Sequence, residues 1–369
     1  GCGPHRGPDP APDFDGGEHM STILGKPITL GGGGKLPDIF GDGSDGDLVI
    51  KAGETVTLPV PVPHQSVIEK NYKSITIEAG GVLTTADYNA GLVLRCQGNC
   101  TVHGTIDQSG KAPKTNPDST YPYPEELVCG DGGKGGWAQG FKGQATAMAA
   151  RPYGGGYGSG GRGGTRQTSS DSQISGGAGG STENITIDTE AVFVGGSVNS
   201  GAGTNGGGGG GYPGVGGVGG NGPGGDGADS VGIGTSSSWG SGGGGAGNTG
   251  GGVLLLYVGG DVSIDGNILC NGLDGGSGGR GITTERVNYW AVGGAGGGGG
   301  GGGAIYIVHF GTFTNTGNLN VNGGAGGSQG VSQGYQSGGI RENTTMSTAG
   351  EAGAIGTTTI KQYEKGMTA

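Results

Sequence analysis

The stretch Gly252–Gly272, GVLLLYVGGDVSIDGNILCNG, decides the fold, because it recurs as Gly303–Gly323, GAIYIVHFGTFTNTGNLNVNG. The two copies align without a gap, at the offset between Gly252 and Gly303, and their glycines and asparagines largely coincide. A third copy, Leu92–Gly110, LVLRCQGNCTVHGTIDQSG, aligns with the first when Leu92 is placed on Leu254. Repetition at a fixed spacing predicts an architecture of stacked units.

Apolar residues alternate with polar ones inside each copy. Leu254, Leu256, Val258, Val262, Ile264 and Ile268 are matched by Ile305, Ile307, Phe310 with a slip of one residue, Phe313 and Leu319. Alternation with a period of two, interrupted by Gly and Asn, predicts short half-buried strands joined by tight turns. Units this short cannot bury their own apolar face, so we expect them to stack as a β-solenoid or a small sandwich.

A shorter alternating unit occurs twice, as Ser74–Leu83 and Asn184–Phe193, and Gly356–Lys361 is expected to be the closing strand. Two thiols, Cys96 and Cys100, occupy the repeat positions of Val258 and Val262. We therefore expect both to be small buried apolar residues, although a tight reversal could instead bring the two thiols together.

Glycine makes up 102 of the 369 residues, and much of it lies in tracts between the strand units: Gly201–Gly211, Gly214–Gly227, Gly240–Gly252 and Gly293–Gly303. Runs without an X-Y pair between glycines exclude collagen. Such tracts form flexible coil, silk-like sheet, or extended helices with three residues per turn that hydrogen-bond side by side. Their regular placement favours the packed helices.

The sequence thus predicts an all-β fold with polyglycine II helices, in which stacked short strands carry a glycine-helix lattice. Satisfied backbone hydrogen bonds would replace side-chain burial there, each contributing on the order of 1 kcal/mol. The expected scaffold positions are the ends of two glycine runs, namely Gly206, Gly211, Gly296 and Gly303.

Polar, irregular segments follow the glycine tracts: Thr146–Ser175, Ile233–Gly242, Arg280–Val292 and Ser328–Met346. Tyr and Trp offer rigid contact area, while Ser, Gly and Asn adapt their hydrogen bonds, a composition typical of recognition loops. The alternative is that Trp239 and Trp290 cover the ends of the lattice. The candidate receptor-binding residues are Trp239, Arg280, Arg286, Tyr289, Trp290, Tyr335 and Arg341.

The formal charge of −11 argues against a nucleic-acid partner, whose phosphates require clustered Lys and Arg. The longest apolar run, Val253–Val258, is far shorter than a membrane span, and no secretory signal is visible. Five cysteines do not indicate a disulfide framework.

Catalytic and metal-binding patterns are weak. The stretch Gly224–Gly232 fits the calcium-binding nonapeptide of β-rolls formally, but without a second copy beside it. Asp42, Asp45 and Asp47 supply oxygen ligands in one turn, and an acidic solvated turn explains them as well. We expect no metal, no cofactor and no enzymatic activity, with a depolymerase as the alternative that sequence alone leaves open.

The predicted division of the chain has five parts. Residues 1–19 are a tag, leader or disordered start, with Met20 as the expected natural beginning. Residues 20–115 are a β-rich attachment or stacking region, and residues 116–180 are a Gly- and Tyr-rich loop region. Residues 181–361 are the strand and polyglycine receptor-binding domain, and residues 362–369 are a tail.

Three stretches, Phe40–Ile50, Tyr72–Leu83 and Val102–Asp107, resemble the opening of glycine-rich bacteriophage tail-fibre proteins. The later alternation of glycine tracts and loops is similar to the receptor-binding adhesins at the tips of long tail fibres, over roughly residues 36–361. The amino-terminal docking domain of those adhesins has no match here, and the strand units are longer than a pure glycine sandwich needs.

The resemblance implies a virion protein that is made in the host cytoplasm and acts extracellularly. Its loops would bind a bacterial outer-membrane protein or polysaccharide, and its other partners would be tail-fibre or virion proteins. A homotrimer and a monomer both stay open, because fibres are often trimeric whereas a glycine sandwich can satisfy its own bonds. The alternatives are a fibre shaft or capsid-decoration protein without specific binding, and a glycine-rich bacterial cell-surface protein.

Overall fold

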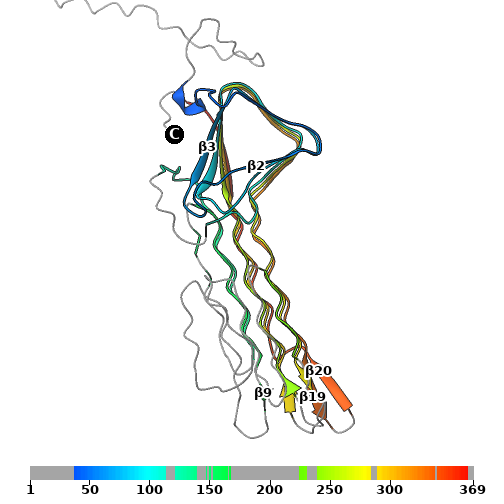
Figure 1. Ribbon diagram of the computed structural model, residues 1–369. Helices are drawn as coiled ribbons and strands as arrows, with labels where there is room; N and C mark the ends of the chain where they lie inside the picture. Colours follow the sequence, from blue (N-terminus) through cyan, green and yellow to red (C-terminus); the bar gives the residue numbers. More distant parts are fainter. Residues whose placement is uncertain are drawn as a thin grey trace, which may run out of the picture. The chain divides into compact units, whose positions relative to one another are not determined.

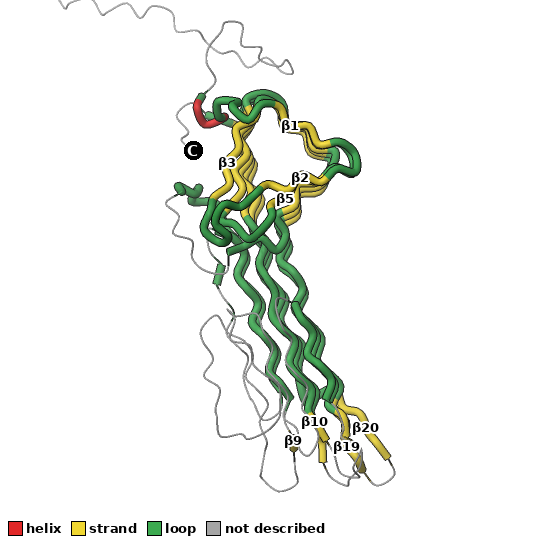
Figure 2. The backbone as a smooth tube through the Cα atoms, viewed as in Figure 1, coloured by secondary structure: helices red, strands yellow, loops and turns green. Residues whose placement is uncertain are grey.

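Three parallel sheets of five strands each stand together as a three-sided β-stack (Figures 1 and 2). The chain passes from one sheet to the next, so that each turn of the stack adds one short strand to every sheet. All described residues of this computed structural model belong to the unit Lys35–Ala369. They are residues 37–113, 121–138, 147, 149–150, 153–164, 166–167, 224–230, 239–283, 289–336 and 339–364.

Each sheet takes every third strand of the stack. Sheet A holds, in order, β1 (Asp47–Ile50), β4 (Ser74–Ile77), β7 (Cys100–Val102), β12 (Val262–Ile264) and β17 (Phe313–Asn315). Sheet B holds β2 (Thr55–Leu58), β5 (Val82–Thr85), β8 (Thr105–Asp107), β13 (Asn267–Leu269) and β18 (Asn318–Asn320). Sheet C holds β3 (Val67–Tyr72), β6 (Gly91–Cys96), β11 (Val253–Val258), β16 (Ala304–His309) and β21 (Thr357–Gln362).

The strand register reproduces the sequence repeat. Val253 lies opposite Ala304, and Leu92 lies opposite Leu254, as the alignments of the three copies predict. The expected slip at Phe310 is wrong, because Val258 pairs with His309 and the register continues without interruption. Strands from the predicted attachment region and from the predicted receptor-binding domain therefore share all three sheets.

Apolar side chains fill the interior of the stack. Leu254, Leu256 and Ile268 are fully buried there, and Cys96 and Cys100 pair with Val258 and Val262 as the repeat predicts. Sheet C departs from the expected half-burial, because every residue of β6, β11 and β16 is buried. Its outer face packs against other parts of the chain, and the residues that cover it include Ile39, Phe40, Tyr121, Leu127 and Tyr363.

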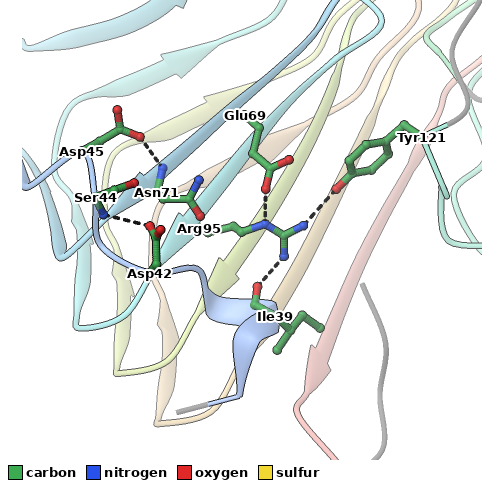
Figure 3. A network of polar contacts seen from close by, with 8 residues as sticks. All are labelled: Ile39, Asp42, Ser44, Asp45, Glu69, Asn71, Arg95 and Tyr121. Atoms are coloured by element: carbon green, nitrogen blue, oxygen red, sulfur yellow. Dashed lines mark hydrogen bonds and ion pairs between the residues drawn. The ribbon is translucent and has the colours of Figure 1, made fainter. Parts of the chain in front are cut away.

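A polar network fastens the beginning of the described chain to sheet C (Figure 3). Arg95 on β6 donates to the carboxylate of Glu69 and to the carbonyl oxygen of Ile39, within the short helix η1 (Asp38–Phe40). A weaker bond of 3.4 Å joins Arg95 to the hydroxyl of Tyr121, and the guanidinium lies 4.9 Å from the ring centre of Tyr257. Charge-assisted bonds of this kind hold the covering segments in place.

Long glycine segments leave the stack after sheet B and return to it before sheet C (Figures 1 and 2). Neighbouring segments lie side by side, some in opposite directions and others in the same direction, as 129–138 and 154–164 do. Within the described residues there are eight such segments, at 129–138, 154–164, 224–230, 241–252, 270–281, 292–303, 321–331 and 347–356.

The segment 292–303, here called the central segment, is hydrogen-bonded to six others. Its successive amides donate in turn to three neighbours: Gly297 to Gly276, Gly298 to Ser159, and Gly299 to Glu351. Its carbonyls accept from the other three neighbours, as when Gly327, Asn248 and Gly133 donate to Gly297, Gly298 and Gly299. The pattern repeats every third residue, so every N–H and C=O from Gly294 to Gly302 has a partner.

Close approach of the backbones explains why glycine is required. A Cβ atom added at Gly294, or at any residue from Gly296 to Gly303, would lie 1.8–2.1 Å from a neighbouring backbone oxygen. Real Cβ atoms do not come so close. Among the described residues the single helix is η1, and it is too short to cross a membrane.

Candidate functional site

Two small antiparallel sheets lie where the glycine segments turn back, and together they are called the distal sheets here (Figure 2). The larger has the order β20, β19, β15, β9, and the smaller pairs β10 with β14. Strands β10 and β14 also contact β15. The six strands are β9 (Arg166–Gln167), β10 (Trp239–Gly240), β14 (Ile282–Thr283), β15 (Tyr289–Ala291), β19 (Ser332–Gln336) and β20 (Gly339–Asn343).

Serine side chains mark the change from glycine segment to strand. The Ser230 hydroxyl accepts the amide of Ile282 at 2.8 Å, and the Ser332 hydroxyl accepts the amide of Gly293 at 2.9 Å. In both bonds a side-chain oxygen accepts the amide, whereas inside the glycine segments the acceptors are backbone carbonyls. The eight hydrogen-bonded glycine segments are called the glycine lattice here. At its end, serine side chains take over as hydrogen-bond acceptors, next to the strands of the distal sheets.

Five of the predicted recognition residues lie on adjacent strands of the distal sheets. In the register of β15 and β19, Tyr289 pairs with Tyr335 and Trp290 pairs with Gly334. Arg341 pairs with Gly334 from β20, while Trp239 on β10 pairs with Thr283. Arg280 ends the glycine segment that leads into β14, and Arg286 lies outside the described residues. The sequence separates these residues widely, and the fold gathers them.

Trp290 is partly buried because its indole ring lies against the backbone of β19. A Cβ atom added at Gly334 would be 2.5 Å from the ring, so glycine makes room for it. Such packing supports the structural alternative for Trp290, in which the ring covers the end of the scaffold. Exposed side chains on the neighbouring strands are then the better candidates for contact with a partner.

Strands β19 and β20 also contribute to an exposed polar cluster. The guanidinium of Arg280 is 2.7 Å from the Glu342 carboxylate, which also accepts a bond of 3.2 Å from the Gln333 amide. Ile340 is 53% exposed on the same edge strand, next to Arg341. Sequence reasoning missed Gln333, Ile340 and Glu342 individually, although all three lie within the irregular segment Ser328–Met346.

Two of the predicted scaffold glycines are described. The amide of Gly296 donates to Thr348 at 3.1 Å, and that of Gly303 donates to Cys270 at 2.7 Å. An added Cβ would lie 1.8 Å from a carbonyl oxygen at Gly296 and 1.9 Å at Gly303. Gly206 and Gly211 lie outside the described residues, as does the second short unit, Asn184–Phe193.

The candidate calcium ligands each serve a backbone or side-chain bond instead of converging. Asp42 accepts the amide of Ser44 at 2.9 Å, Asp45 that of Asn71 at 2.7 Å, and Asp47 the hydroxyl of Ser74 at 2.6 Å. In the nonapeptide, Asp226 and Asp229 accept amides of a neighbouring glycine segment, each at 2.6 Å. The described residues contain no group of three His, Cys, Asp or Glu side chains placed to hold a metal ion.

The described cysteines are buried free thiols. Burial raises the pKa of Cys96 to about 11 and that of Cys129 to about 12, and it also raises the pKa of Cys100 and Cys270. The thiolate is the nucleophilic form of cysteine. These thiols are therefore poor nucleophiles at neutral pH and belong to the packing of the fold.

Comparison with known proteins gives no assignment: no family model, no curated protein and no solved structure matches this chain.

Proposed function

We propose that this protein is a bacteriophage tail-fibre or fibre-tip adhesin that attaches the virion to a bacterial surface. In this proposal polyglycine II helices form the scaffold and the distal sheets with their loops form the binding surface. The partner would be an outer-membrane protein or a surface polysaccharide, and the protein's other contacts would be with virion components.

The hydrogen-bond geometry supports the helical interpretation of the glycine segments. A helix with three residues per turn directs its amides in three directions, so each neighbour receives a bond from every third residue. The central segment follows this period toward all six of its neighbours. A flexible coil would have neither the period nor the requirement for glycine at consecutive positions.

One observation carries the functional part of the proposal: six strands from different parts of the chain meet at the far end of the glycine segments. Inside the lattice the backbone bonds are used up, and the central segment is buried. The distal sheets, in contrast, offer charged, amide and apolar side chains to solvent, among them Arg280, Gln333 and Ile340. A rigid base with a chemically varied end is what a recognition protein requires.

The experiment measures binding of fluorescently labelled protein to a panel of Gram-negative and Gram-positive cells. A double variant, Ile340→Ser with Arg341→Ala, removes exposed apolar and charged groups from β20. We expect at least a tenfold loss of binding, about 1.4 kcal/mol, with an unchanged melting temperature. The matched control is Val49→Ser with Lys51→Ala on the β-stack, where Val49 is 45% exposed.

Equal binding by the two double variants on cells that bind the native protein would contradict the proposal. Binding to no strain would favour the alternative of a shaft or decoration protein. Detection of the chain by mass spectrometry in purified virions, or in bacterial cell envelopes, would separate both phage functions from a bacterial surface protein.

A further inference from the structure

Among the described glycine segments, 321–331 and 347–356 form the last layer of the lattice. Both are bonded to the central segment on one side: Gly324, Gly327 and Gly330 donate to it, and Thr348, Glu351 and Ala354 accept from it. They are also bonded to each other, since Gly350 donates to Gly327 and Gly353 donates to Gly324. The opposite side of this layer carries no further segment among the described residues.

The segment 347–356 repeats the central segment at the offset that places Ala304 opposite Thr357. Gly350, Gly353 and Gly356 accordingly sit on Gly297, Gly300 and Gly303, where an added Cβ would meet a carbonyl oxygen at 2.0, 2.0 and 1.7 Å. At the same offset, Ala349, Ala352 and Ile355 take the places of Gly296, Gly299 and Gly302.

Those three glycines are the ones that face the next layer. A Cβ atom at Gly296, Gly299 or Gly302 would lie 1.8, 2.1 or 1.8 Å from a carbonyl oxygen of the segment 321–331. In the last layer the equivalent side chains are present and point to solvent: Ala349 and Ala352 are exposed, and Ile355 is 67% exposed. The same contact with a further glycine segment is therefore sterically impossible.

The backbone amides on this side of the last layer are free to donate hydrogen bonds to a further segment. The amides of Gly296, Gly299 and Gly302 donate to the segment 347–356, whereas those of Ala349, Ala352 and Ile355 have no hydrogen-bond partner among the described residues. Unpaired main-chain donors at the edge of an ordered array invite addition of another chain, and β-sheet proteins block such edges with side chains. An edge of packed glycine segments presents the same hazard.

We infer that Ala349, Ala352 and Ile355 terminate the glycine lattice and close this face to another glycine layer, whether from the same chain or from a second copy. Three side chains at every third position are enough, because each blocks one turn of the facing segment. This closure of the scaffold does not depend on receptor binding.

The test adds a layer in register. A second copy of residues 304–356, inserted between Gly356 and Thr357, begins where β21 now pairs with β16. One version keeps the original Ala349, Ala352 and Ile355, and the other carries Ala349→Gly, Ala352→Gly and Ile355→Gly in the original copy. Hydrogen–deuterium exchange is then measured in the inserted glycine segments.

We expect exchange in the inserted segments to be ~100-fold slower in the glycine version, because only there can they dock and protect their amides. A third version, with Ala325→Gly and Ser328→Gly, is the matched control. Both residues are exposed and belong to the same layer, but they are not among the three positions proposed to block the next one. In this control the inserted glycine segments should exchange as fast as those of the version that keeps Ala349, Ala352 and Ile355. Equal protection in the first two versions, or protection in neither, would overturn the inference.

Discussion

The β-stack and the glycine lattice belong to one compact unit but are held together in different ways. In the stack, buried side chains such as Leu254, Leu256 and Ile305 fill a three-sided interior. In the lattice, backbone amides and carbonyls bond to neighbours on six sides of the central segment, and side chains are largely absent. Burial of apolar area stabilises the first region, whereas satisfied backbone bonds stabilise the second.

This difference determines what each region tolerates. Cores accept apolar exchanges of similar volume at a cost below about 1.5 kcal/mol. The lattice has no such freedom, because the smallest addition, a Cβ atom, already overlaps a neighbouring carbonyl oxygen at Gly299. The two regions should therefore differ in the size and kind of their response to substitution.

The largest effect is expected for Gly299→Leu in the central segment. The amide of Gly299 donates to Glu351 at 3.0 Å, and its carbonyl accepts from Gly133 at 2.7 Å. A side chain here separates the neighbouring segments and leaves buried backbone groups unpaired, at about 2 kcal/mol each. We expect the free energy of unfolding to fall by about 4 kcal/mol, measured by urea denaturation.

The matched control is Ala352→Leu, the equivalent position in the last layer. Its side chain faces solvent, so the change should stay within about 0.5 kcal/mol. If both variants were equally stable, the segments could separate without cost, and the lattice would contribute nothing to stability.

Leu256→Ala in the β-stack should have the next largest effect. Leu256 is fully buried on β11, in the middle of sheet C, and its removal leaves a cavity. Such changes cost about 3 kcal/mol. Urea unfolding measures the loss, and Leu256→Met, which preserves volume, should cost less than about 1.5 kcal/mol. A similar loss for both variants would mean that the interior depends on shape as strictly as the lattice does.

Much of the stack could be predicted from the sequence, because the spacing of the sequence repeat equals the offset between paired strands. The offset between Gly252 and Gly303 becomes the pairing of β11 with β16, and the buried positions follow the alternation. Full burial of sheet C could not be predicted, since it depends on Ile39, Phe40 and Tyr363, which are remote in sequence from β11. The same packing explains Phe310, whose ring centre lies 6.3 Å from that of Phe40 outside the stack.

The distal sheets were less accessible to sequence reasoning. Composition singled out the irregular segments and most of the aromatic residues in them. It did not indicate that the ring of Trp290 packs against Gly334, or that Arg280 pairs with Glu342. Both contacts join strands or segments that are far apart in the sequence. The strands involved are also too short for a periodic pattern.

A smaller effect is expected from Asp45, which joins the turn before β1 to sheet C (Figure 3). The backbone amide of Asn71 and the ammonium of Lys70 lower the pKa of this carboxyl. A lowered pKa in the folded state gives stability that is complete above the ordinary value near 4 and is lost as pH falls below it. We expect Asp45→Asn to cost about 1 kcal/mol at pH 6 and less at pH 3, measured by urea unfolding at both pH values.

A cost for Asp45→Asn that stays the same at pH 3 would show that the charge of Asp45 is unimportant. The variant Asp42→Asn in the same turn is a useful control. Asp42 accepts a local bond from Ser44, two residues away, whereas Asp45 bonds to β3, so substitution of Asp42 should change stability less.

The smallest effect on stability is expected for Glu342→Gln in the distal sheets. The carboxylate of Glu342 is bound to Arg280 at 2.7 Å, but both side chains are about half exposed, and exposed pairs contribute less than about 1 kcal/mol. The matched variant is Glu78→Gln on the β-stack, where the carboxylate is 2.8 Å from Lys51. Thermal melting should not distinguish the two variants, whereas cell binding should fall only for Glu342→Gln, because only that pair lies on the proposed binding surface. Binding that falls equally for both would point to overall charge, and not the distal sheets, as the basis of attachment.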